Sequence, residues 1–387
     1  MKRIGNIFDQ ITSLENIRMA DAIARIGKKD QYGIVCHDRN RDANIMALQE
    51  ALVNKTFTTS AYKTSVIKDP KERIVSKLPY RDRIVHHALM IPIERMFINC
   101  FTSDSYASIK GRGVHAASDA LMLQLRDQPG TKYCLKLDVK KFYPNVDHDV
   151  LKTLIRRKIK DPDALWLIDD IIDSAPGLPI GNYTSAFFAN LYLNGLDHTV
   201  KEVMGVKNYI RYMDDIIITA PTKEYLHQIL FLIRTYLAEK LKLSLKENYR
   251  IFPSALGIDA FGYVHYYGYK RLRKRVKQRF ARAVASGKPW SSIASYLGWA
   301  SHANCNHLLK KLLNGTNQFQ IIKYPNQNKI FRRTKYRGRR HHGSGDHNTG
   351  LQDRTVQVPG EIREMPHSPD QVPRQTAGGI LRFEKPD

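Results

Sequence analysis

Three short segments near the middle of the chain have the residue patterns that are typical of β-strands. Polar and apolar residues alternate over residues 133–138, a segment that ends in an aspartate. Residues 208–212 and the β-branched residues 216–219 flank a tight turn that carries Asp214 and Asp215. The sequence between the first strand and this hairpin is long enough for helical crossovers. We therefore expect the three strands to lie side by side in one sheet.

A second hairpin is predicted closer to the N-terminus. Basic and apolar residues alternate over residues 62–68 and 73–77, and the turn signal Asp69-Pro70-Lys71 separates the two segments. The pattern indicates a two-stranded ribbon with one cationic face, which suits binding of a triphosphate.

Apolar residues recur at helical spacing in much of the remaining chain. The expected helical segments are residues 1–60, with one apolar face over 43–54, a helix starting near residue 81, a basic amphipathic helix over 232–243, a basic helix over 271–282, and one helix or a pair over 294–313. Helices mixed with hairpin-connected strands predict an α+β fold.

The aspartates of the central hairpin differ from the second such pair in the chain. Asp169-Asp170 lies in a segment with helical periodicity, where a solvated helix face is the expected environment. Asp214-Asp215 lies at a hairpin, where two like charges repel and neither can pack in a core. A divalent cation removes that cost, and two-metal sites draw carboxylates from separate strands. Together with Asp138 the pair predicts a site for two Mg²⁺ ions, with Mn²⁺ as a substitute.

With these residues in view, the chain resembles a reverse transcriptase. Leu137-Asp138 match the first catalytic motif, and residues 212–215 (Tyr-Met-Asp-Asp) match the YxDD box. Three further matches follow in the expected order: residues 105–113 resemble the motif before the palm in bacterial enzymes, residues 178–190 the helix that contacts template and nucleotide, and Phe261-Gly262-Tyr263 the primer grip. The similarity extends over roughly residues 5–320.

The resemblance implies a right-hand polymerase with fingers, an antiparallel palm sheet backed by helices, and a helical thumb. The implied segments are 1–115 for N-terminal helices and fingers, 116–268 for the palm with interleaved fingers helices, 269–323 for the thumb and 324–387 for a basic tail. The implied activity is RNA-directed DNA synthesis by two-metal phosphoryl transfer, in which a primer 3′-hydroxyl attacks the α-phosphate of a dNTP. Template RNA, primer or cDNA, and dNTPs are the implied partners.

The resemblance also assigns roles at the nucleotide. Arg73 matches the triphosphate-binding arginine and Lys63 is a second cationic candidate, although a solvated edge strand is the alternative for both. Tyr143 matches the aromatic steric gate against a ribose 2′-hydroxyl, with ordinary core packing as its alternative. Lys246 lies near the place where polymerases hold a lysine that protonates the leaving pyrophosphate.

The nucleic acid is expected to follow the grip and the thumb. Phe261, Gly262 and Tyr263 would form the primer grip. The expected basic contacts with the nucleic-acid backbone are Arg112, Arg271, Arg273, Lys274 and Arg275.

One motif resembles the reverse transcriptases of diversity-generating retroelements. Ile180 stands before Gly181, where group II intron and retroviral enzymes usually have Gln, and Ile cannot hydrogen-bond an incoming nucleotide. This subclass misincorporates opposite template adenine and works with a small basic oligomeric accessory protein. Ala186 departs from the subclass, which usually has Gln after the motif's serine. A retron-type, phage-defence or intron-derived enzyme is the alternative, and a nucleic-acid-binding protein with an inactive palm is a second.

Bulk composition favours a cytoplasmic protein that binds nucleic acid. The chain has 62 Lys and Arg against 37 Asp and Glu, a formal charge of +25 that indicates a polyanionic partner. No apolar run reaches about 18 residues, and no signal-peptide core follows Met1, so no membrane association is expected. The four cysteines are scattered, which indicates neither a disulfide framework nor a zinc knuckle. The polar tail from about residue 324 is expected to be disordered.

Overall fold

The computed structural model describes residues 3–68, 72–313, 319–322 and 330–333, which all belong to the first of two units, residues 1–335. The α-helices are α1 (Phe8–Thr12), α2 (Leu14–Ala24), α3 (Tyr32–Asp38), α4 (Arg41–Val53), α5 (Tyr80–Cys100), α6 (Val114–Gln124), α7 (His148–Arg156), α8 (Pro162–Asp173), α9 (Tyr183–His198), α10 (Lys223–Leu241), α11 (Lys274–Ala285), α12 (Trp290–Ser301) and α13 (Asn306–Leu313). The strands are β1 (Lys63–Ile67), β2 (Arg73–Lys77), β3 (Ser105–Tyr106), β4 (Tyr133–Asp138), β5 (Asn208–Tyr212), β6 (Asp215–Ala220), β7 (Arg250–Pro253), β8 (Ile258–Ala260), β9 (Tyr263–Tyr266), β10 (Tyr269–Leu272), β11 (Phe319–Ile322) and β12 (Ile330–Arg333). Short turns of other helix types are η1 (Pro129–Thr131), η2 (Tyr143–Asn145), η3 (Thr199–Val203) and η4 (Ser254–Leu256).

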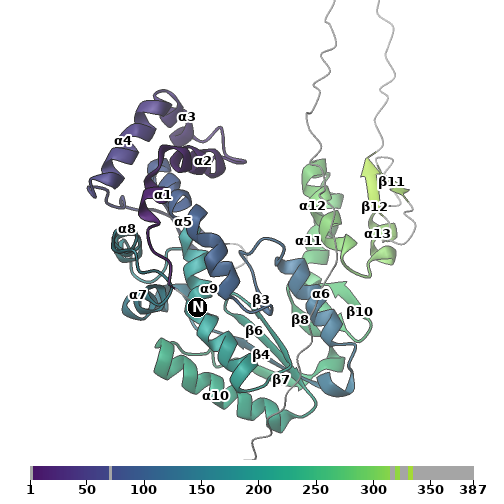
Figure 1. The fold of residues 1–387 in the computed structure, drawn as a ribbon. Helices are drawn as coiled ribbons and strands as arrows, with labels where there is room; N and C mark the ends of the chain where they lie inside the picture. Colours follow the sequence, from purple (N-terminus) through teal and green to yellow (C-terminus); the bar gives the residue numbers. More distant parts are fainter. Residues whose placement is uncertain (1–2, 69–71, 314–318, 323–329, 334–387) are drawn as a thin grey trace, which may run out of the picture. The chain divides into compact units, whose positions relative to one another are not determined.

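A five-stranded sheet with the order β3-β5-β6-β4-β7 lies at the centre of the fold (Figure 1). Strands β4, β5, β6 and β7 pair antiparallel, as the sequence predicts. The short edge strand β3 instead pairs parallel to β5, so the expectation of a purely antiparallel sheet is wrong at this edge. The mixture of helices with mainly antiparallel strands confirms the predicted α+β class.

The two faces of this sheet pack against different layers, because successive side chains of a strand point to opposite faces. Ile216 and Ile218 of β6 belong to the large core that includes buried residues of α5, α9 and α10. Ile217 of β6 and Ile210 of β5 pack instead with α6 and with Ile258 of β8. Burial on both faces explains why β6 is apolar without interruption from residue 216 to 218.

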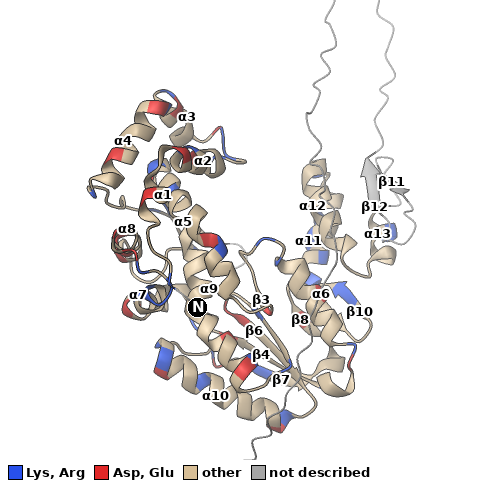
Figure 2. Cartoon of the chain, in the orientation of Figure 1, with Lys and Arg blue, Asp and Glu red and all other residues tan. Residues whose placement is uncertain are grey.

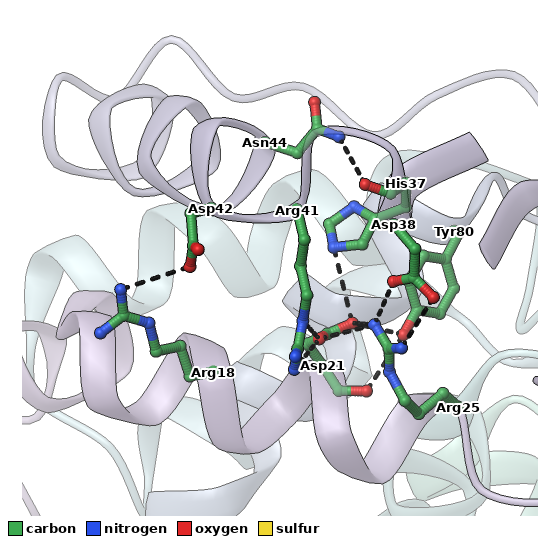
Figure 3. A network of polar contacts seen from close by, with 9 residues as sticks. All are labelled: Arg18, Asp21, Arg25, His37, Asp38, Arg41, Asp42, Asn44 and Tyr80. Carbon is green, nitrogen blue, oxygen red and sulfur yellow. Dashed lines mark hydrogen bonds and ion pairs between the residues drawn. The ribbon is translucent and has the colours of Figure 1, made fainter. Parts of the chain in front are cut away.

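The N-terminal helices α2 and α4 are held to α5 by one buried carboxylate (Figure 3). Asp21 accepts hydrogen bonds from Arg25 at 2.8 Å, from Arg41 at 2.8 Å and from the hydroxyl of Tyr80 at 2.5 Å. Burial acts to raise the pKa of Asp21, but these hydrogen bonds together outweigh it and hold the pKa below its usual value. These N-terminal helices therefore have a polar anchor in addition to their apolar core.

A three-stranded sheet, β10-β9-β8, precedes the helices α11, α12 and α13. Tyr263, Phe280 and Leu309 are among the buried residues of a separate core that joins this sheet to the helices. The predicted basic helix over 271–282 begins later than expected. Arg271 and Leu272 pair with β9 in β10, and α11 starts at Lys274.

Other sequence boundaries shift for local reasons. The segment 294–313 forms two helices, α12 and α13, and α12 already begins at Trp290 after Pro289. Helix α10 begins at Lys223, where the Thr222 hydroxyl caps it, and ends at Leu241 before Lys242 at φ +52°. The predicted turn at 69–71 lies outside the described residues, as does most of the tail from residue 324 that is predicted to be disordered. Within that tail the prediction is wrong for Ile330–Arg333, which form β12 and pair antiparallel with β11. None of the described helices is both long enough and apolar enough to cross a bilayer.

Candidate active site

Asp138 and Asp215 face each other across neighbouring strands. The register of β4 and β6 makes them Cα partners, and Asp215 is also the Cα partner of Tyr212 on β5. Facing Cα atoms in an antiparallel ladder lie roughly 4.5–5.5 Å apart. The backbone N–H of Val139, next to Asp138, donates to the carbonyl of Asp214 at 3.2 Å. The structure thus brings together the three carboxylates that the sequence predicts as catalytic.

The hairpin that carries the aspartate pair has a two-residue turn. Met213 and Asp214 form the turn, whereas Asp215 is already the first residue of β6. Met213 has φ +54°, a left-handed conformation that is uncommon for a residue with a side chain. The two aspartates therefore occupy different backbone environments, although they are adjacent in sequence.

Burial penalises ionisation of the aspartate pair. It raises the pKa of Asp214, and the charges of Asp138 and Asp215 raise it further. Burial also raises the pKa of Asp215, opposed by the charge of Lys136 and reinforced by that of Asp138. Two carboxylates in this state favour binding of either protons or a cation.

Asp138 has a lysine as its counter-ion. The Nζ atom of Lys246 lies 2.5 Å from Oδ2 of Asp138, and the backbone N–H of Lys246 donates to the Asp138 carbonyl at 2.9 Å. The other carboxylate oxygen, Oδ1, is buried and has no hydrogen-bond partner among the described residues. This oxygen is chemically suited to a hard cation.

The carboxylates fit a divalent cation by chemistry rather than by a preformed cage. Within the described ranges no cluster of three or more His, Cys, Asp or Glu side chains is arranged to hold a metal ion. The unpartnered oxygen of Asp138 and the raised pKa values of Asp214 and Asp215 nevertheless mark oxygen donors that lack sufficient positive charge. These three residues are the ones that would hold a divalent ion, with Lys246 as competitor.

Tyr143 lies beside the turn of the aspartate hairpin. Its hydroxyl is 3.9 Å from the sulfur of Met213. Burial raises its pKa to about 12, and the charge of Asp214 acts in the same direction. The neighbouring Phe142 is buried and packs against the Tyr192 ring, whereas Tyr143 is only half-buried. Phe142 therefore takes the core position, and Tyr143 faces the site.

The β1–β2 ribbon is tied to the segment that contains Ile180 and Gly181. The Ser76 N–H of β2 donates to the Ile180 carbonyl at 2.8 Å. Gly181 has φ +128°, and a Cβ atom there would lie 2.3 Å from the Ser76 carbonyl oxygen, so only glycine fits. Ile180 is half-buried, and Arg73 and Lys63 are exposed on the ribbon. The two predicted nucleotide-binding segments thus form one unit.

The predicted primer grip is the turn between β8 and β9. Phe261 and Gly262 both have positive φ, and the Phe261 ring centroid lies 5.7 Å from that of Tyr212. A Cβ atom on Gly262 would lie 2.2 Å from Cζ3 of Trp299 in α12. Tyr263 is fully buried and donates a hydrogen bond to the Trp299 carbonyl at 3.0 Å. Its ring is therefore part of the core beneath the hairpin and is not exposed to solvent.

The predicted basic contacts fall into two groups. Arg112 is half-buried and donates to the Thr102 carbonyl at 2.8 Å, which braces its own loop. The other residues line β10 and the start of α11, where Figure 2 shows Lys and Arg in blue. Arg271 stacks on the Tyr269 ring at 5.1 Å and Arg273 pairs with Asp259, while Lys274 and Arg275 are exposed.

Sequence reasoning missed a buried charged pair behind the aspartate hairpin. Arg211 and Asp197 are both fully buried and form an ion pair with an N–O distance of 2.6 Å. Their mutual attraction outweighs the burial that lowers the pKa of Arg211, so this pKa is raised. The available signal was an arginine at an inward position of an apolar strand.

Comparisons with known proteins agree with this arrangement. The family described as reverse transcriptase (RNA-dependent DNA polymerase) matches residues 62–248. The retron Ec73 reverse transcriptase of Escherichia coli is 27% identical over 203 residues, which cover 46% of this chain and 63% of that protein. The group II intron-encoded protein LtrA of Lactococcus lactis subsp. cremoris is 27% identical over 135 residues, which cover 32% and 22%.

The chain spans less than two thirds of the length of either relative. A solved structure of apo telomerase from Candida tropicalis is similar at a TM-score of 0.45 and 13% identity, over 65% of this chain and 54% of that one. The family match begins one residue before β1 and ends two residues after Lys246, so it contains all three carboxylates. Residues 62–248 therefore form a reverse transcriptase domain with relatives among retron and group II intron proteins.

Proposed function

We propose that this chain is an RNA-directed DNA polymerase that copies a template RNA into cDNA. The observation that carries the proposal is the register of β4 and β6, which sets Asp138 opposite Asp215 within the reverse transcriptase domain. Carboxylates from two strands at one sheet edge are what phosphoryl transfer with divalent ions needs.

In this proposal each group at the site has a distinct task. Asp138, Asp214 and Asp215 hold divalent ions, with Mg²⁺ as the expected metal. When bound, such ions activate the primer hydroxyl and stabilise the negative charge of the leaving pyrophosphate. Lys246, whose ammonium lies 2.5 Å from Oδ2 of Asp138, gives a proton to the leaving pyrophosphate after the ammonium has left this carboxylate.

The surrounding residues orient substrate and nucleic acid. Arg73 and Lys63 on the β1–β2 ribbon bind the triphosphate, and Tyr143 excludes the 2′-hydroxyl of a ribonucleotide. The hairpin of Phe261 and Gly262 positions the primer end. The basic residues of β10 and α11 bind the backbone of the duplex, so affinity falls steeply with salt.

Primer extension on an RNA template tests the activity. The double variant Asp214→Asn, Asp215→Asn should lose extension by more than about 10³-fold, because it removes the ionisable pair. The matched control is Asp169→Asn, Asp170→Asn on α8, a second aspartate pair whose members contact Arg156 and Thr59. Equal extension by wild type and the 214–215 variant would refute the site.

We further propose that the enzyme belongs to a diversity-generating retroelement and misincorporates opposite template adenine. The supporting feature is Ile180, whose backbone carbonyl binds Ser76 and whose apolar side chain cannot hydrogen-bond a nucleotide. Loss of one positioning contact reduces the difference in kcat/KM between correct and incorrect nucleotides. A basic oligomeric accessory protein would be its partner. Ala186, half-buried on α9, remains the departure from this subclass.

Sequencing of cDNA made in vitro tests this assignment. The expected product has errors concentrated at template adenines, and Ile180→Gln should reduce them by roughly tenfold, the effect of one added contact. Ile180→Leu is the matched apolar control and should keep the errors. An error spectrum that is the same in all three proteins would contradict this role of Ile180.

A retron-type enzyme is the second candidate, favoured by the identity to the retron Ec73 protein over 203 residues. It would give an accurate cDNA. The error spectrum at adenine therefore separates the two candidates.

A further inference from the structure

Arg211 is the second-last residue of β5, two positions before the turn residue Met213. It is the largest fully buried side chain among the described residues. Its neighbours in the strand, Tyr209 and Ile210, are also buried. A buried guanidinium is costly unless each of its donors has a partner.

The donors of this guanidinium are held in a fixed orientation. Nε donates to Oδ1 of Asp197 at 2.7 Å, and Nη2 donates to Oδ2 at 2.6 Å, a bidentate pair. Asp197 itself is held by the hydroxyls of Ser105 at 2.5 Å and Tyr209 at 2.6 Å. These elements come from α9, β3 and β5, so the fork cannot turn without moving three segments.

The remaining nitrogen is directed at the turn of the aspartate hairpin. Nη1 donates to the backbone carbonyl of Met213 at 3.1 Å and to Oδ1 of Asn190 at 3.0 Å. Met213 is the residue with φ +54°, and its carbonyl belongs to the peptide that leads into Asp214. A left-handed conformation at a residue with a side chain persists only where the surroundings hold it.

We propose that Arg211 is a positioning residue that fixes the Met213–Asp214 peptide and thereby sets the aspartate pair opposite Asp138. The inference rests on the proposed polymerase function. Asp197 anchors the guanidinium, and Arg211 acts on the reaction only through the turn. Displacement of a carboxylate by about 1 Å is enough to slow a reaction by roughly 100-fold.

The test compares two buried variants of the same network. Arg211→Lys keeps the positive charge, but one ammonium nitrogen cannot occupy both the Asp197 and the Met213 positions. Tyr209→Phe removes one of the two hydroxyl bonds to Asp197 but leaves the Ser105 bond, both bonds of the Arg211–Asp197 pair and the Met213 contact in place, so Arg211 still has its full anchor. Arg211→Lys should lower kcat by about 10- to 100-fold with the dNTP KM within about threefold, whereas Tyr209→Phe should stay within about twofold of wild type.

Hydrogen exchange gives a readout that does not need activity. The Val139 N–H donates to the Asp214 carbonyl, so a loosened turn should speed exchange in peptides that cover residues 137–140. We expect faster exchange in Arg211→Lys and not in Tyr209→Phe. If Arg211→Lys does not fold, Asp197→Asn is measured in the same two assays and should change both in the same direction.

The inference is overturned if the Arg211 and Tyr209 variants behave alike in either assay. A fall in kcat without faster exchange, or faster exchange without a fall in kcat, also overturns it. If the wild-type protein extends no primer, the proposed polymerase function fails. Exchange alone then decides whether Arg211 holds the turn.

Discussion

The ammonium of Lys246 lies 2.5 Å from Oδ2 of Asp138, at the edge of the sheet where Asp138 faces Asp215. A lysine in this position neutralises one of three neighbouring carboxylates. A divalent ion at Asp138 would therefore compete with Lys246, and in the proposed mechanism the displaced ammonium is the proton donor.

Removal of this lysine should separate metal binding from catalysis. Lys246→Met should bind Mn²⁺ more tightly, because a competing cation is gone, and should lower kcat by roughly 10²-fold, because a proton donor is gone. Mn²⁺ titration by electron paramagnetic resonance and single-nucleotide extension measure the two effects. Lys242→Met, which breaks an exposed pair with Asp147 at 2.7 Å, is the control and should change neither. Unchanged Mn²⁺ affinity in Lys246→Met would contradict the competition.

The aspartate pair should make stability depend on pH in an unusual direction. Burial raises the pKa of Asp214 and Asp215 above the ordinary value of 3.8, so the folded protein binds more protons than the unfolded chain. The free energy of unfolding therefore falls as pH rises from the ordinary value through the raised one. Without divalent ions at about pH 8, Asp214→Asn or Asp215→Asn should increase it by about 0.5–2 kcal/mol.

This gain in stability should vanish at about pH 3, below the ordinary pKa, because the aspartates are then protonated and neutral in both the folded and the unfolded protein. Thermal denaturation at the two pH values measures the difference. Asp138→Asn is the contrast, because it breaks the pair with Lys246 and should not stabilise the protein. Lower stability of the Asp214 and Asp215 variants at high pH would argue against a charge penalty at the site.

Tyr143 should control the choice between deoxyribo- and ribonucleotides. Its ring lies beside Met213 and is half-exposed, while Phe142 fills the core. Tyr143→Ala should reduce the preference for dATP over ATP by roughly 100-fold, because the ring that excludes the 2′-hydroxyl is lost. Tyr143→Phe keeps the ring and should keep the preference. The ratio of kcat/KM for the two nucleotides is the measurement, and a ratio unaffected by the alanine would remove Tyr143 from this role.

Alanine substitutions of two glycines in neighbouring turns should distinguish the cost of backbone strain from the cost of overlap with Trp299 at the predicted grip. Gly262 has φ +83° with Trp299 against it, whereas Gly268 has φ +82° and nothing within 4 Å of an added Cβ atom. Alanine at either position costs about 1–2 kcal/mol for the left-handed backbone. Gly262→Ala should cost about 1–3 kcal/mol more because of the overlap with Trp299. Denaturant unfolding compares the two, and equal losses would mean that Trp299 moves aside freely.

Sequence patterns predicted the carboxylates of the site, but not the tertiary contacts that hold them in place. Asp138 and the 214–215 pair could be predicted because they lie where strands end or begin, and strand periodicity is a local property of the sequence. The pairing of Arg211 with Asp197 could not be predicted, because it joins β5 to the end of α9 and depends on how these elements pack in the folded chain. Lys246 was named from the resemblance, but its ion pair with Asp138 was not predicted, because it follows from the isolated bridge between Leu245 and Val139 and from the backbone bond of Lys246 to Asp138.

The same limit applies to the fold. The glycine at 181 was predicted from a motif, but its cause is the Ser76 carbonyl 105 positions earlier in the chain, which leaves no room for a side chain. The parallel pairing of β3 was missed because a two-residue strand has too little sequence to show a pattern. The observed helix boundaries differ from the predicted ones where a cap or a strand pair, such as Leu272 with Tyr263, fixes the conformation of residues that could be helical or extended.

Binding of Mn²⁺ to the complex with primer, template and an unreactive dNTP analogue shows whether Asp138 on β4 and the aspartates of the β5–β6 hairpin act as one metal site. Asp138→Asn alone and Asp214→Asn, Asp215→Asn together should each weaken Mn²⁺ binding by at least about tenfold relative to wild type, because both strands supply ligands. Wild-type Mn²⁺ affinity in either variant, with the complex still formed, would contradict this shared site.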